Sequence, residues 1–496
     1  MNKSDYKILF VTFFNDEAIG VRCLHSILYN NGYNVKMFFL KVNVPTRCTD
    51  YKKGVKDSFN SNADHLTNKE LLLFKEFVSD YKPNILAVSL VSSNYMLYKR
   101  IYSELRSLTD LKIVLGGWQP TLNPEECIAF CDYLCVGEGE EALPELVDKM
   151  FTNQPVDDLK NIWINKGDRI IRNPIRPLVE DLSLEPVPVF DDDLSYYIEN
   201  EELIHAEPYR ANTRYGIITG RGCPYSCTYC SNVYMAKELY PKKWQGVRSR
   251  TIEHVMSELI ETKAKLPYIE SINFYDEVFM PKEDWAKRFF DRYVKEIGLP
   301  FYCEFYPGTC NEKKAKMLKE AGLEGVWLGV QSGSSRVRKE VFKRHYKNET
   351  VIEQAGIFHK YGISVRYDFI LDNPFESFEE SLETIHLMME LPQPYSMNIF
   401  SLNYFPKTDI ATKALSEGLI SEEELSDQVY REQQNMEITM NNENSDRNFI
   451  NHLATYISLL SFDSRLEKRE INSIVDNYLL HKRVQPIQEA LKPYLV

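Results

Sequence analysis

Three cysteines stand close together in the stretch GRGCPYSCTYCSN, which runs from Gly220 to Asn232. Cys223, Cys227 and Cys230 form a C-x3-C-x2-C array, and neither a paired C-x2-C nor an H-x3-H follows it. Structural zinc needs four protein ligands, and iron–sulfur clusters are normally held by four cysteine thiolates. A set of three therefore favours a cluster in which one iron keeps an open position, rather than a zinc loop or a chance grouping.

A second cysteine triplet has a different pattern. CIAFCDYLC places cysteines at 127, 131 and 135, spaced for successive turns of a helix, but the segment changes from helix to strand near Tyr133. Free cysteines behave as small buried hydrophobes. We therefore predict that Cys127, Cys131 and Cys135 pack in a core, with an auxiliary cluster as the alternative.

Length and composition indicate a folded protein of two or three domains. The chain has 496 residues, of which 44% are hydrophobic and 26% charged, as in ordinary globular proteins. The net charge of -13 argues against a nucleic-acid partner. The N-terminus MNKSDYKILFVTFF lacks the features of a signal peptide, and no apolar run approaches the roughly 20 residues of a membrane span. We expect a cytoplasmic protein, in which thiols stay reduced and clustered cysteines bind metal rather than form disulfides.

Residues 1–150 show the pattern of a doubly wound, Rossmann-like α/β domain. Apolar runs alternate with helix-like segments, and these runs are KILFVTF, NVKMFFL, NILAVSLV, KIVLGG and YLCVGEGE. Such parallel sheets bind ligands at the carboxyl ends of their strands. Small or acidic residues follow three of the runs, at Ser89, Ser92, Ser93, Gly116, Gly117 and Gly137 to Glu140. They fit either a ligand site or ordinary turns between strand and helix.

A second alternating pattern extends over residues 213–407. It contains six strand-like runs separated by helices, namely YGIITG, SINFYDE, PFYCEFY, GVWLGVQSGS, ISVRYDFIL and YSMNIFSLNYF. Six βα units are too few for a closed eight-fold barrel and predict an open partial (β/α)6 barrel. The cysteine array follows the first run, at the face where barrels keep their active sites. Cys303 and Cys310 flank FYPG on the third run, and neither receives a role from the sequence.

The remaining segments connect and follow these two patterns. Residues 151–212 have no regular period and include the proline-rich, acidic LEPVPVFDDD, so we expect a connector. Residues 408–496 are polar and helix-prone, with SEEEL offering an N-cap and an acidic first turn. We expect a helical C-terminal domain, and we consider it a candidate lid that excludes water from the active site.

The array of Cys223, Cys227 and Cys230 resembles the signature of the radical S-adenosylmethionine (SAM) superfamily. In that family, the amino and carboxylate groups of SAM chelate the open iron of a [4Fe-4S] cluster. Tyr229, directly before the last cysteine, also fits the family's pattern. The resemblance implies that the three cysteines hold the cluster and that Tyr229 belongs to the SAM site.

Two later segments resemble the parts of this family that hold SAM. INFYDEVF ends a strand with Asp276 and Glu277, where the family places acids that engage the SAM amino group. GVWLGVQSGS looks like the ribose-binding segment, with Gln331 where glutamate is commoner, followed by Ser332. The turn YDFILDNPFES replaces the usual Gly-x-Pro-Gly-Glu, and Lys407 stands where similar proteins have glycine. These departures concern the substrate side of the pocket more than the SAM side.

The N-terminal domain resembles the cobalamin-binding domain that precedes many radical SAM barrels. The segment IVLGGWQPTLNPEE, followed by DYLCVGEGEEALPEL, carries this resemblance. Together with the radical SAM segments, the resemblance to the two-domain class extends over roughly residues 6 to 405. It implies cobalamin contacts at Ser89, Ser93, Gly116, Gly117, Trp118, Gly137, Glu138 and Gly139. Trp118 also fits ordinary packing. The Asp-x-His-x-x-Gly motif of histidine-ligated cobalamin is absent and His25 has the wrong flanks, so we expect no histidine ligation.

The combined resemblance implies an enzyme that uses a [4Fe-4S] cluster, SAM and cobalamin. A low-potential donor such as flavodoxin or ferredoxin would reduce the cluster, and SAM would be cleaved to methionine and a 5′-deoxyadenosyl radical. That radical would take a hydrogen atom from an unactivated carbon of a small molecule or peptide. Methylcobalamin would then give a methyl group to the resulting substrate radical. Ring closure or rearrangement without methyl transfer is the first alternative. A corrinoid-binding sensor with a vestigial barrel is the second. Because both cofactor sites follow parallel strands, we expect them to face each other.

Overall fold

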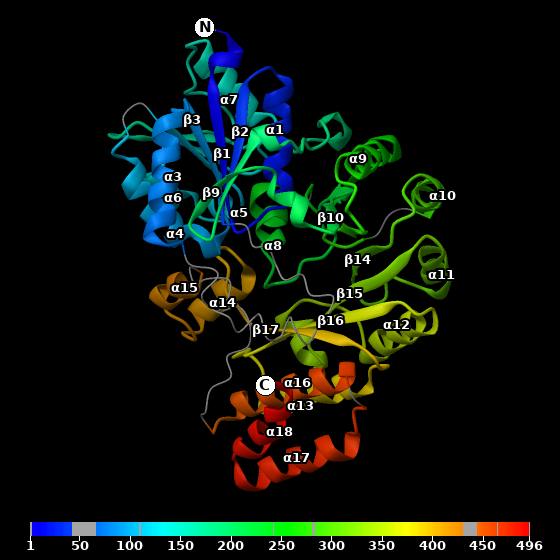
Figure 1. The fold of residues 1–496 in the computed structure, drawn as a ribbon. Helices are drawn as coiled ribbons and strands as arrows, with labels where there is room; N and C mark the ends of the chain where they lie inside the picture. Colours follow the sequence, from blue (N-terminus) through cyan, green and yellow to red (C-terminus); the bar gives the residue numbers. More distant parts are fainter. Residues whose placement is uncertain are drawn as a thin grey trace. The chain divides into compact units, whose positions relative to one another are not determined.

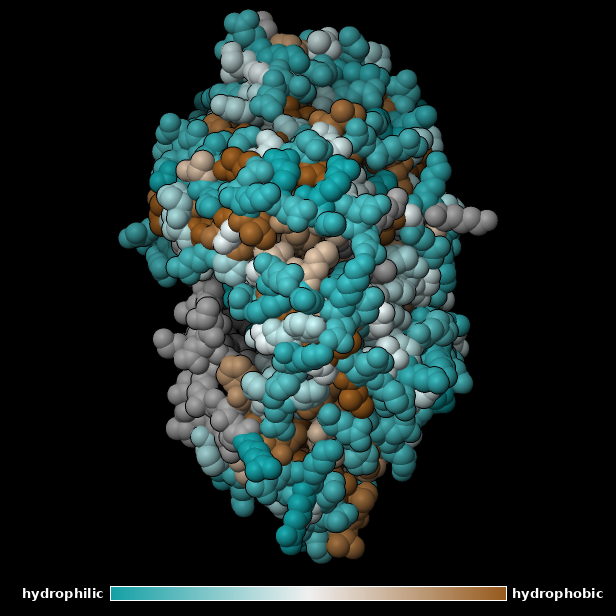
Figure 2. Space-filling view, turned by 90° about the vertical axis from the view of Figure 1, so that its right-hand side faces the viewer, coloured by the Kyte–Doolittle hydropathy of each residue, from teal (hydrophilic) through white to brown (hydrophobic). Residues whose placement is uncertain are grey.

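The chain forms two compact units, described here from a computed structural model of residues 2–41, 66–108, 111–241, 243–279, 283–429, 444–463 and 465–495. One unit comprises Met1–Gly216 with Tyr234–Ile269, and the other comprises Ile217–Val233 with Glu270–Val496. Each unit is built from α-helices and β-strands (Figure 1). Within the described ranges, no helix is both long and apolar enough to cross a membrane. On the face drawn in Figure 2, hydrophobic residues are interspersed among hydrophilic ones.

The first unit contains the doubly wound sheet that the sequence predicts. Five parallel strands lie in the order β5-β4-β3-β1-β2. Their bounds are Lys7–Phe13 (β1), Asn34–Leu40 (β2), Ile85–Ser89 (β3), Lys112–Gly116 (β4) and Tyr133–Cys135 (β5). The strand order reverses at β1, and loops after β3, β4 and β5 leave the sheet at its carboxyl edge. In such sheets this edge is the usual ligand-binding position.

Helices cover this sheet because each presents an apolar side to it. The helices are α1 (Ile19–Asn30), α3 (Asn68–Tyr81), α4 (Tyr95–Leu105), α5 (Trp118–Leu122), α6 (Pro124–Cys127) and α7 (Ala142–Phe151). Buried residues of α1 and α7 share one core with β1, β2 and β4. α3 begins with a capping box, in which Thr67 and Glu70 bond each other's backbone N–H groups.

Residues 151–212 do more than connect the two patterns. They add β6 (Ile162–Asn165) and β7 (Ile170–Arg172) beside β5, and β8 (Ser195–Glu199) and β9 (Glu202–His205) beside β2. The result is a nine-stranded mixed sheet, in which the β5–β6, β6–β7 and β8–β9 pairs are antiparallel. These strands have three to five residues each and are only partly buried, so they leave little periodic signal in the sequence.

The second sheet has the six strands that the sequence predicts, in the order β10-β13-β14-β15-β16-β17. The bounds are Arg214–Ile217, Ser271–Phe274, Phe301–Phe305, Leu323–Gln331, Ser364–Leu371 and Ser396–Ser401. The pairs from β13 to β17 are parallel. Because β10 and β17 lie at opposite edges, the barrel is open. In Figure 1, three of its helices line one side of this sheet, namely α10 (Glu283–Glu296), α11 (Glu312–Glu320) and α12 (Asn348–Lys360).

The two faces of this sheet differ in chemistry. On β14, Phe301 stacks on Phe290 of α10, and Phe305 packs against Phe358 of α12. Cys303 alternates with them and is buried, so it points into the helix layer. Residues of the opposite face, which we call the inner face, are partly or fully exposed: Tyr302, Glu304, Trp327, Gln331, Arg366, Asp368 and Asn398. The inner face is therefore polar and open to a ligand.

The C-terminal region is helical, as expected. It contains α14 (Asp409–Ser416), α15 (Glu422–Val429), α16 (Asp446–Asp463), α17 (Lys468–His481) and α18 (Gln485–Leu495). α16 packs against β17 and α13 (Phe378–Glu390) and thereby covers the edge strand (Figure 1). The N–H of Ile410 donates to the carbonyl of Thr228 in the cysteine loop (3.0 Å). α14 therefore supports that loop, and the lid role of the region after Thr408 stays a prediction.

Candidate functional site

The cysteine array lies in the loop after β10 and is fixed by its neighbours. The Oγ1 of Thr228 donates to the carbonyl of Val341 (2.6 Å), and its N–H donates to the carbonyl of Phe342 (3.3 Å). The N–H of Cys230 donates to the carbonyl of Cys227 (3.1 Å), which closes a tight turn. The ring of Tyr229 packs edge-on against Phe342 and joins an apolar cluster that includes α14. The loop is thus held before any ligand binds.

The three thiols form one electrostatic group. Cys227 is buried, and Cys223 and Cys230 are half-buried. Burial is the main cause that raises the pKa of Cys223 to about 12 and that of Cys230 to about 11. Cys227 contributes to both shifts, and Cys230 contributes to that of Cys223. Such thiols stay protonated in water, whereas a bound metal removes their protons. Their clustering is the chemistry expected of a metal-binding loop.

The number of protein ligands separates the two kinds of metal site that three thiols can suggest. Structural zinc takes four protein ligands, and no paired cysteine or histidine motif follows the array. Among the described residues, one set of three metal-ligating atoms lies within 4.8 Å of one another, and it belongs to Cys23, Glu140 and Glu185 in the first unit. A cluster that takes one thiolate on each of three irons fits a set of three cysteines.

Arg344 is a fourth member of the group of side chains around the three thiols. The sequence did not identify it. Its guanidinium is buried, and Nη1 donates to the Sγ of Cys227 (3.2 Å) and to the Oη of Tyr229 (3.0 Å). Nη2 donates to the carbonyl of Gly329 (2.5 Å), and the group lies 4.2 Å above the ring of Tyr306. Across the described residues, no carboxylate comes within ion-pair distance of Arg344, and its Nε lacks a hydrogen-bond partner.

A buried cation with no carboxylate in contact with it is stabilised by another anion, because an unpaired buried charge is costly. The polar groups in contact with Arg344 are the Cys227 thiol, the Tyr229 and Tyr346 phenols and the Gly329 carbonyl. The Asp368 carboxylate lies farther away, although Arg344 lowers its pKa, so among the contacting groups the thiol is the one that a metal readily converts to an anion. A metal-bound Cys227 thiolate supplies that charge. The residues present therefore fit a [4Fe-4S] cluster at Cys223, Cys227 and Cys230.

The acids predicted to engage the SAM amino group lie just after β13. Asp276 is buried, and its two oxygens accept hydrogen bonds from the Oγ1 (2.8 Å) and the N–H (3.2 Å) of Thr219. Burial raises the pKa of Asp276 to about 7, although the Thr219 bonds oppose the shift. Glu277 is more exposed, and its charge raises the pKa of both Cys223 and Cys230. The loops after β10 and β13 thus bring Glu277 beside the thiols.

Gln331 ends β15 and Ser332 follows it, and the two side chains lie in different environments. Gln331 is half-buried with a φ of 71°, next to an irregularity in the β15–β16 register. Ser332 is fully buried, and its Oγ accepts from the N–H of Ser334 (3.1 Å) and lies 3.4 Å from the Oγ1 of Thr384. Gln331 therefore remains available on the inner face, while Ser332 holds the turn.

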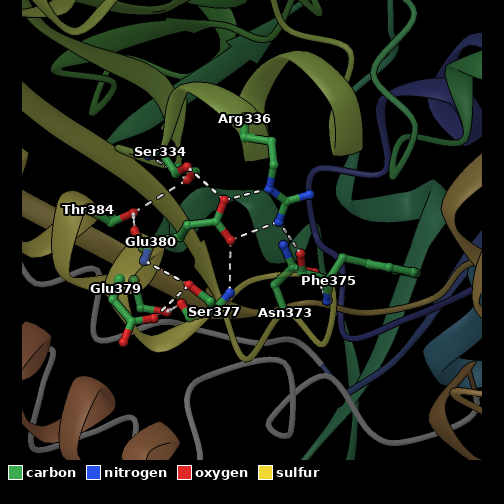
Figure 3. A network of polar contacts seen from close by, with 10 residues as sticks. Ser334, Arg336, Asn373, Phe375, Ser377, Glu379, Glu380 and Thr384 are labelled. Atoms are coloured by element: carbon green, nitrogen blue, oxygen red, sulfur yellow. Dashed lines mark hydrogen bonds and ion pairs between the residues drawn. The ribbon is translucent and has the colours of Figure 1, made fainter.

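A polar network fixes this turn against α13 (Figure 3). The carboxylate of Glu380 accepts from Nε (2.6 Å) and Nη2 (2.8 Å) of Arg336, and from the N–H of Ser377 (2.9 Å). The N–H of Gly333 donates to the Oγ1 of Thr384 (2.8 Å). A Cβ on Gly333 would lie 2.5 Å from the backbone of α13, so only glycine permits this contact. The network thus holds the turn that directly follows Gln331.

The inner face carries two further acids that the sequence reasoning missed. Glu304 is exposed on the inner face, yet the protein around it raises its pKa to about 7 by partial desolvation, and the charges of Asp368, Glu277 and Asp276 raise it as well. Burial raises the pKa of Asp368 to about 6, against the hydrogen bond that it accepts from the Nδ2 of Asn398 (2.8 Å). Carboxyl groups that repel one another favour a cationic ligand. The amino and sulfonium groups of SAM have this character.

The turns after β3 and β4 in the first unit pack closely together. Gly117 has a φ of 98°, and a Cβ there would lie 2.7 Å from the carbonyl oxygen of Leu90. Glycine is therefore required at this position by the protein itself. Trp118 begins α5 and is 40% exposed, so it is open to a ligand rather than packed in the core. Ser89 and Ser93 are half-buried beside this turn.

The turn after β5 serves another purpose. The N–H of Glu138 donates to the Oη of Tyr240 (3.2 Å), and its carboxylate pairs with Arg248 (2.7 Å). A Cβ on Gly137 would collide with the Oη of Tyr240 at 2.2 Å, whereas one on Gly139 would meet only ordinary contacts at 3.6 Å. Gly137 and Glu138 thus hold residues 234–269 onto the sheet. Their predicted contact with cobalamin stays a prediction.

His25 and the second cysteine triplet lie in apolar surroundings. His25 is 1% exposed and stacks on Tyr29, and burial lowers its pKa to about 3. Cys127, Cys131 and Cys135 are buried, and burial raises the pKa of Cys127 and Cys135 to about 12. These positions agree with core packing of the triplet, and cobalamin held without histidine stays a prediction.

Both sheet-containing parts of the chain match known protein families. Residues 7–147 match the model of the B12 binding domain, and residues 217–388 match that of the radical SAM superfamily. An uncharacterized methyltransferase of Pyrococcus horikoshii is 24% identical over 355 residues, covering 70% of this chain and 72% of the relative.

Two solved structures share the fold. The radical SAM methyltransferase TsrM from Kitasatospora setae, solved with cobalamin and a [4Fe-4S] cluster, has a TM-score of 0.61 at 18% identity. The match covers 84% of this chain and 75% of TsrM. OxsB, a cobalamin-dependent SAM radical enzyme, has a TM-score of 0.63 at 15% identity, covering 96% of this chain and 71% of OxsB. The order of domains and the overall fold agree with the expectation from the sequence.

Proposed function

Because this chain belongs to the cobalamin-dependent radical SAM enzymes, we propose that it transfers a methyl group to an unactivated carbon of its substrate. A [4Fe-4S] cluster, SAM and cobalamin are the cofactors of this family. TsrM and the Pyrococcus horikoshii relative are both named methyltransferases, which supports the proposal. The observation that carries the cluster in this proposal is the buried Arg344 guanidinium beside the Cys227 thiol, where a metal-bound thiolate would supply an anion.

In this proposal, Cys223, Cys227 and Cys230 hold the cluster, and the residues around them hold SAM. Glu277 faces the SAM amino group, since it is the more exposed acid and lies near the thiols. Gln331 lies on the inner face, and its amide forms a hydrogen bond with a hydroxyl of the SAM ribose. Asp276, Tyr229 and Ser332 position these groups through their own contacts.

The corrinoid site is proposed at the carboxyl ends of β3, β4 and β5. Trp118 and the backbone at Gly116 and Gly117 offer exposed contacts there, with Ser89 and Ser93 nearby. The other predicted cobalamin contacts, at Gly137, Glu138 and Gly139, lie in the turn after β5. Glu138 fixes this turn through its own hydrogen bond and ion pair within the protein. No histidine is assigned to cobalt, because His25 is buried in the core.

When bound, these cofactors supply reductive cleavage of SAM and a transferable methyl group. The protein's own residues bind, orient and shield. Glu277, Glu304 and Asp368 are acids near the proposed SAM site, and a cationic ligand would favour the ionised forms of Glu304 and Asp368, whose pKa values are raised in its absence. We further propose a low-potential donor such as flavodoxin or ferredoxin, a small-molecule or peptide substrate and a cytoplasmic location. The proposed domains are the cobalamin-binding domain (1–150), the connector (151–212), the radical SAM domain (213–407) and the helical C-terminal domain (408–496).

The test uses full-length protein, reconstituted without oxygen with iron, sulfide and hydroxocobalamin. It is given a low-potential reductant, SAM with a deuterated methyl group, and candidate substrates. We expect the deuterated methyl group to appear first on the corrinoid and then on the product, with formation of 5′-deoxyadenosine. Formation of 5′-deoxyadenosine and a product without label on either molecule would contradict methyl transfer.

Ring closure or rearrangement without methyl transfer is the second candidate. It is supported by OxsB, which is named a cobalamin-dependent SAM radical enzyme rather than a methyltransferase and whose fold matches 96% of this chain. The same experiment separates the two candidates, because this reaction leaves the deuterated methyl group on SAM or on methionine.

A further inference from the structure

We infer that Arg344 sets the reduction potential of the cluster, by holding a positive charge against the Cys227 sulfur. The inference rests on the proposed cluster at Cys223, Cys227 and Cys230. It adds a positioning residue that acts on electron entry rather than on SAM or the substrate.

The contact is direct and comes from a distant part of the chain. The Nη1 of Arg344 lies 3.2 Å from the Sγ of Cys227, across 117 residues of sequence. Potentials of iron–sulfur clusters depend on net charge, on hydrogen bonds to the sulfurs and on solvent exposure. Arg344 acts on the first two of these quantities at once. Because both groups are buried, salt and water screen the interaction only weakly.

The guanidinium is held so that it cannot turn away from the sulfur. Nη2 is bonded to the Gly329 carbonyl, and the flat face lies on the ring of Tyr306 at 4.2 Å. Tyr306 is stacked in turn on Tyr225 of the cysteine loop, at 3.7 Å between ring centroids and 8° between planes. Such a fixed, planar donor keeps its geometry when the charge on the cluster changes.

The direction of the effect follows from charge. One-electron reduction adds a negative charge to the cluster, while Arg344 keeps its positive charge throughout. The attraction is therefore stronger in the reduced state, and Arg344 makes reduction easier. Glu277 has the opposite sign and lies near Cys223 and Cys230, so it makes reduction harder.

The experiment compares variants of the full-length, reconstituted protein in the absence of SAM. Arg344→Gln removes the charge, and Arg344→Lys keeps it but loses the planar contact. Arg338→Gln is the matched control, because Arg338 is also buried in the same unit but bonds the carbonyl of Ser332 and no cysteine. Iron and sulfide are counted in each variant, and the midpoint potential is measured by titration of the reduced-cluster EPR signal.

For Arg344→Gln we expect the equilibrium constant for reduction to fall at least tenfold, which is about 59 mV more negative for one electron. Arg344→Lys should fall between this variant and wild type, Arg338→Gln should match wild type, and Glu277→Gln should shift in the opposite direction. An unchanged potential in Arg344→Gln, or an equal shift in Arg338→Gln, would overturn the inference. Loss of iron from both Arg344 variants but not from Arg338→Gln would also overturn it, because it would assign Arg344 to cluster assembly.

This design distinguishes the inference from the proposed function. Wild-type protein that binds no four-iron cluster after reconstitution would contradict the proposed function itself. A wild-type cluster with normal SAM cleavage, together with unshifted Arg344 variants, would contradict the inference alone.

Discussion

The cysteine loop of the second unit and the glycine turns of the first are two candidate cofactor sites built in different ways. The loop presents side chains, namely three thiols with a buried guanidinium and a carboxylate beside them. The turns present backbone, since Gly117 allows close packing against Leu90 and leaves Trp118 exposed. A cluster needs particular ligand atoms, whereas a corrinoid held without histidine needs a shaped surface. The two sites should therefore respond differently to substitution.

The largest effect is expected in the cysteine loop. Cys227→Ala should lose the iron–sulfur absorbance and essentially all SAM cleavage, because a methyl group cannot replace a thiolate ligand. Iron content and 5′-deoxyadenosine formation measure the outcome. Cys131→Ala is the matched control from the second triplet and should keep its iron. Four irons and full cleavage in Cys227→Ala would contradict the cluster assignment.

A smaller effect is expected at the glycine turn. Gly117→Ala strains a backbone with a φ of 98° and a Cβ contact of 2.7 Å, at a cost of about 1–3 kcal/mol. If the turn moves to relieve the strain, hydroxocobalamin binding should weaken by about tenfold for each 1.4 kcal/mol. Binding is measured by titration of the full-length protein, and iron content should stay normal. Gly20→Ala, whose Cβ meets open space, is the control. Wild-type corrinoid affinity in Gly117→Ala would place the site elsewhere.

Much of the fold could be predicted from the sequence, because buried parallel strands leave continuous apolar runs. All six strands of the second sheet and five of the first were identified in this way. The strands of residues 151–212 were missed, since short, half-exposed edge strands lack such runs. That the two cofactor sites face each other stays a prediction.

The candidate site could be predicted only where its residues follow one another in the chain. The cysteines, Asp276 and Glu277 stand in short motifs, so their types and spacing were informative. Arg344 reaches Cys227 across 117 residues, and nothing in its local sequence indicates that contact. Glu304 alternates with buried Cys303 and Phe305, and this period of two could have identified it as an inner-face acid.

A still smaller effect concerns pH and His25. Burial lowers the pKa of His25 from 6.5 to about 3, so the folded protein holds this side chain neutral. As pH falls below about 6.5, the unfolded chain takes up a proton that the folded chain does not, and the free energy of unfolding decreases. The slope for one proton is at most about 1.4 kcal/mol per pH unit. Urea unfolding of wild type and His25→Phe between pH 7.5 and pH 5 should show a shallower loss in the variant, and equal slopes would contradict this account.

The substitution His25→Phe is expected to have no effect on the coordination of cobalt. The cob(II)alamin EPR spectrum of the full-length protein should lack nitrogen superhyperfine splitting, because His25 lies in the core, stacked on Tyr29. His25→Phe should give the same spectrum as wild type. Splitting that disappears in His25→Phe would show that this histidine binds cobalt after all.

The central claim is that three cysteines leave one iron of the cluster open for SAM. It is tested most directly by pulsed EPR of the reduced cluster in the full-length protein, with SAM isotopically labelled at its amino nitrogen. The account predicts a hyperfine coupling that changes with the nitrogen isotope and is absent without SAM. A spectrum that is the same with labelled SAM, unlabelled SAM and no SAM would contradict it.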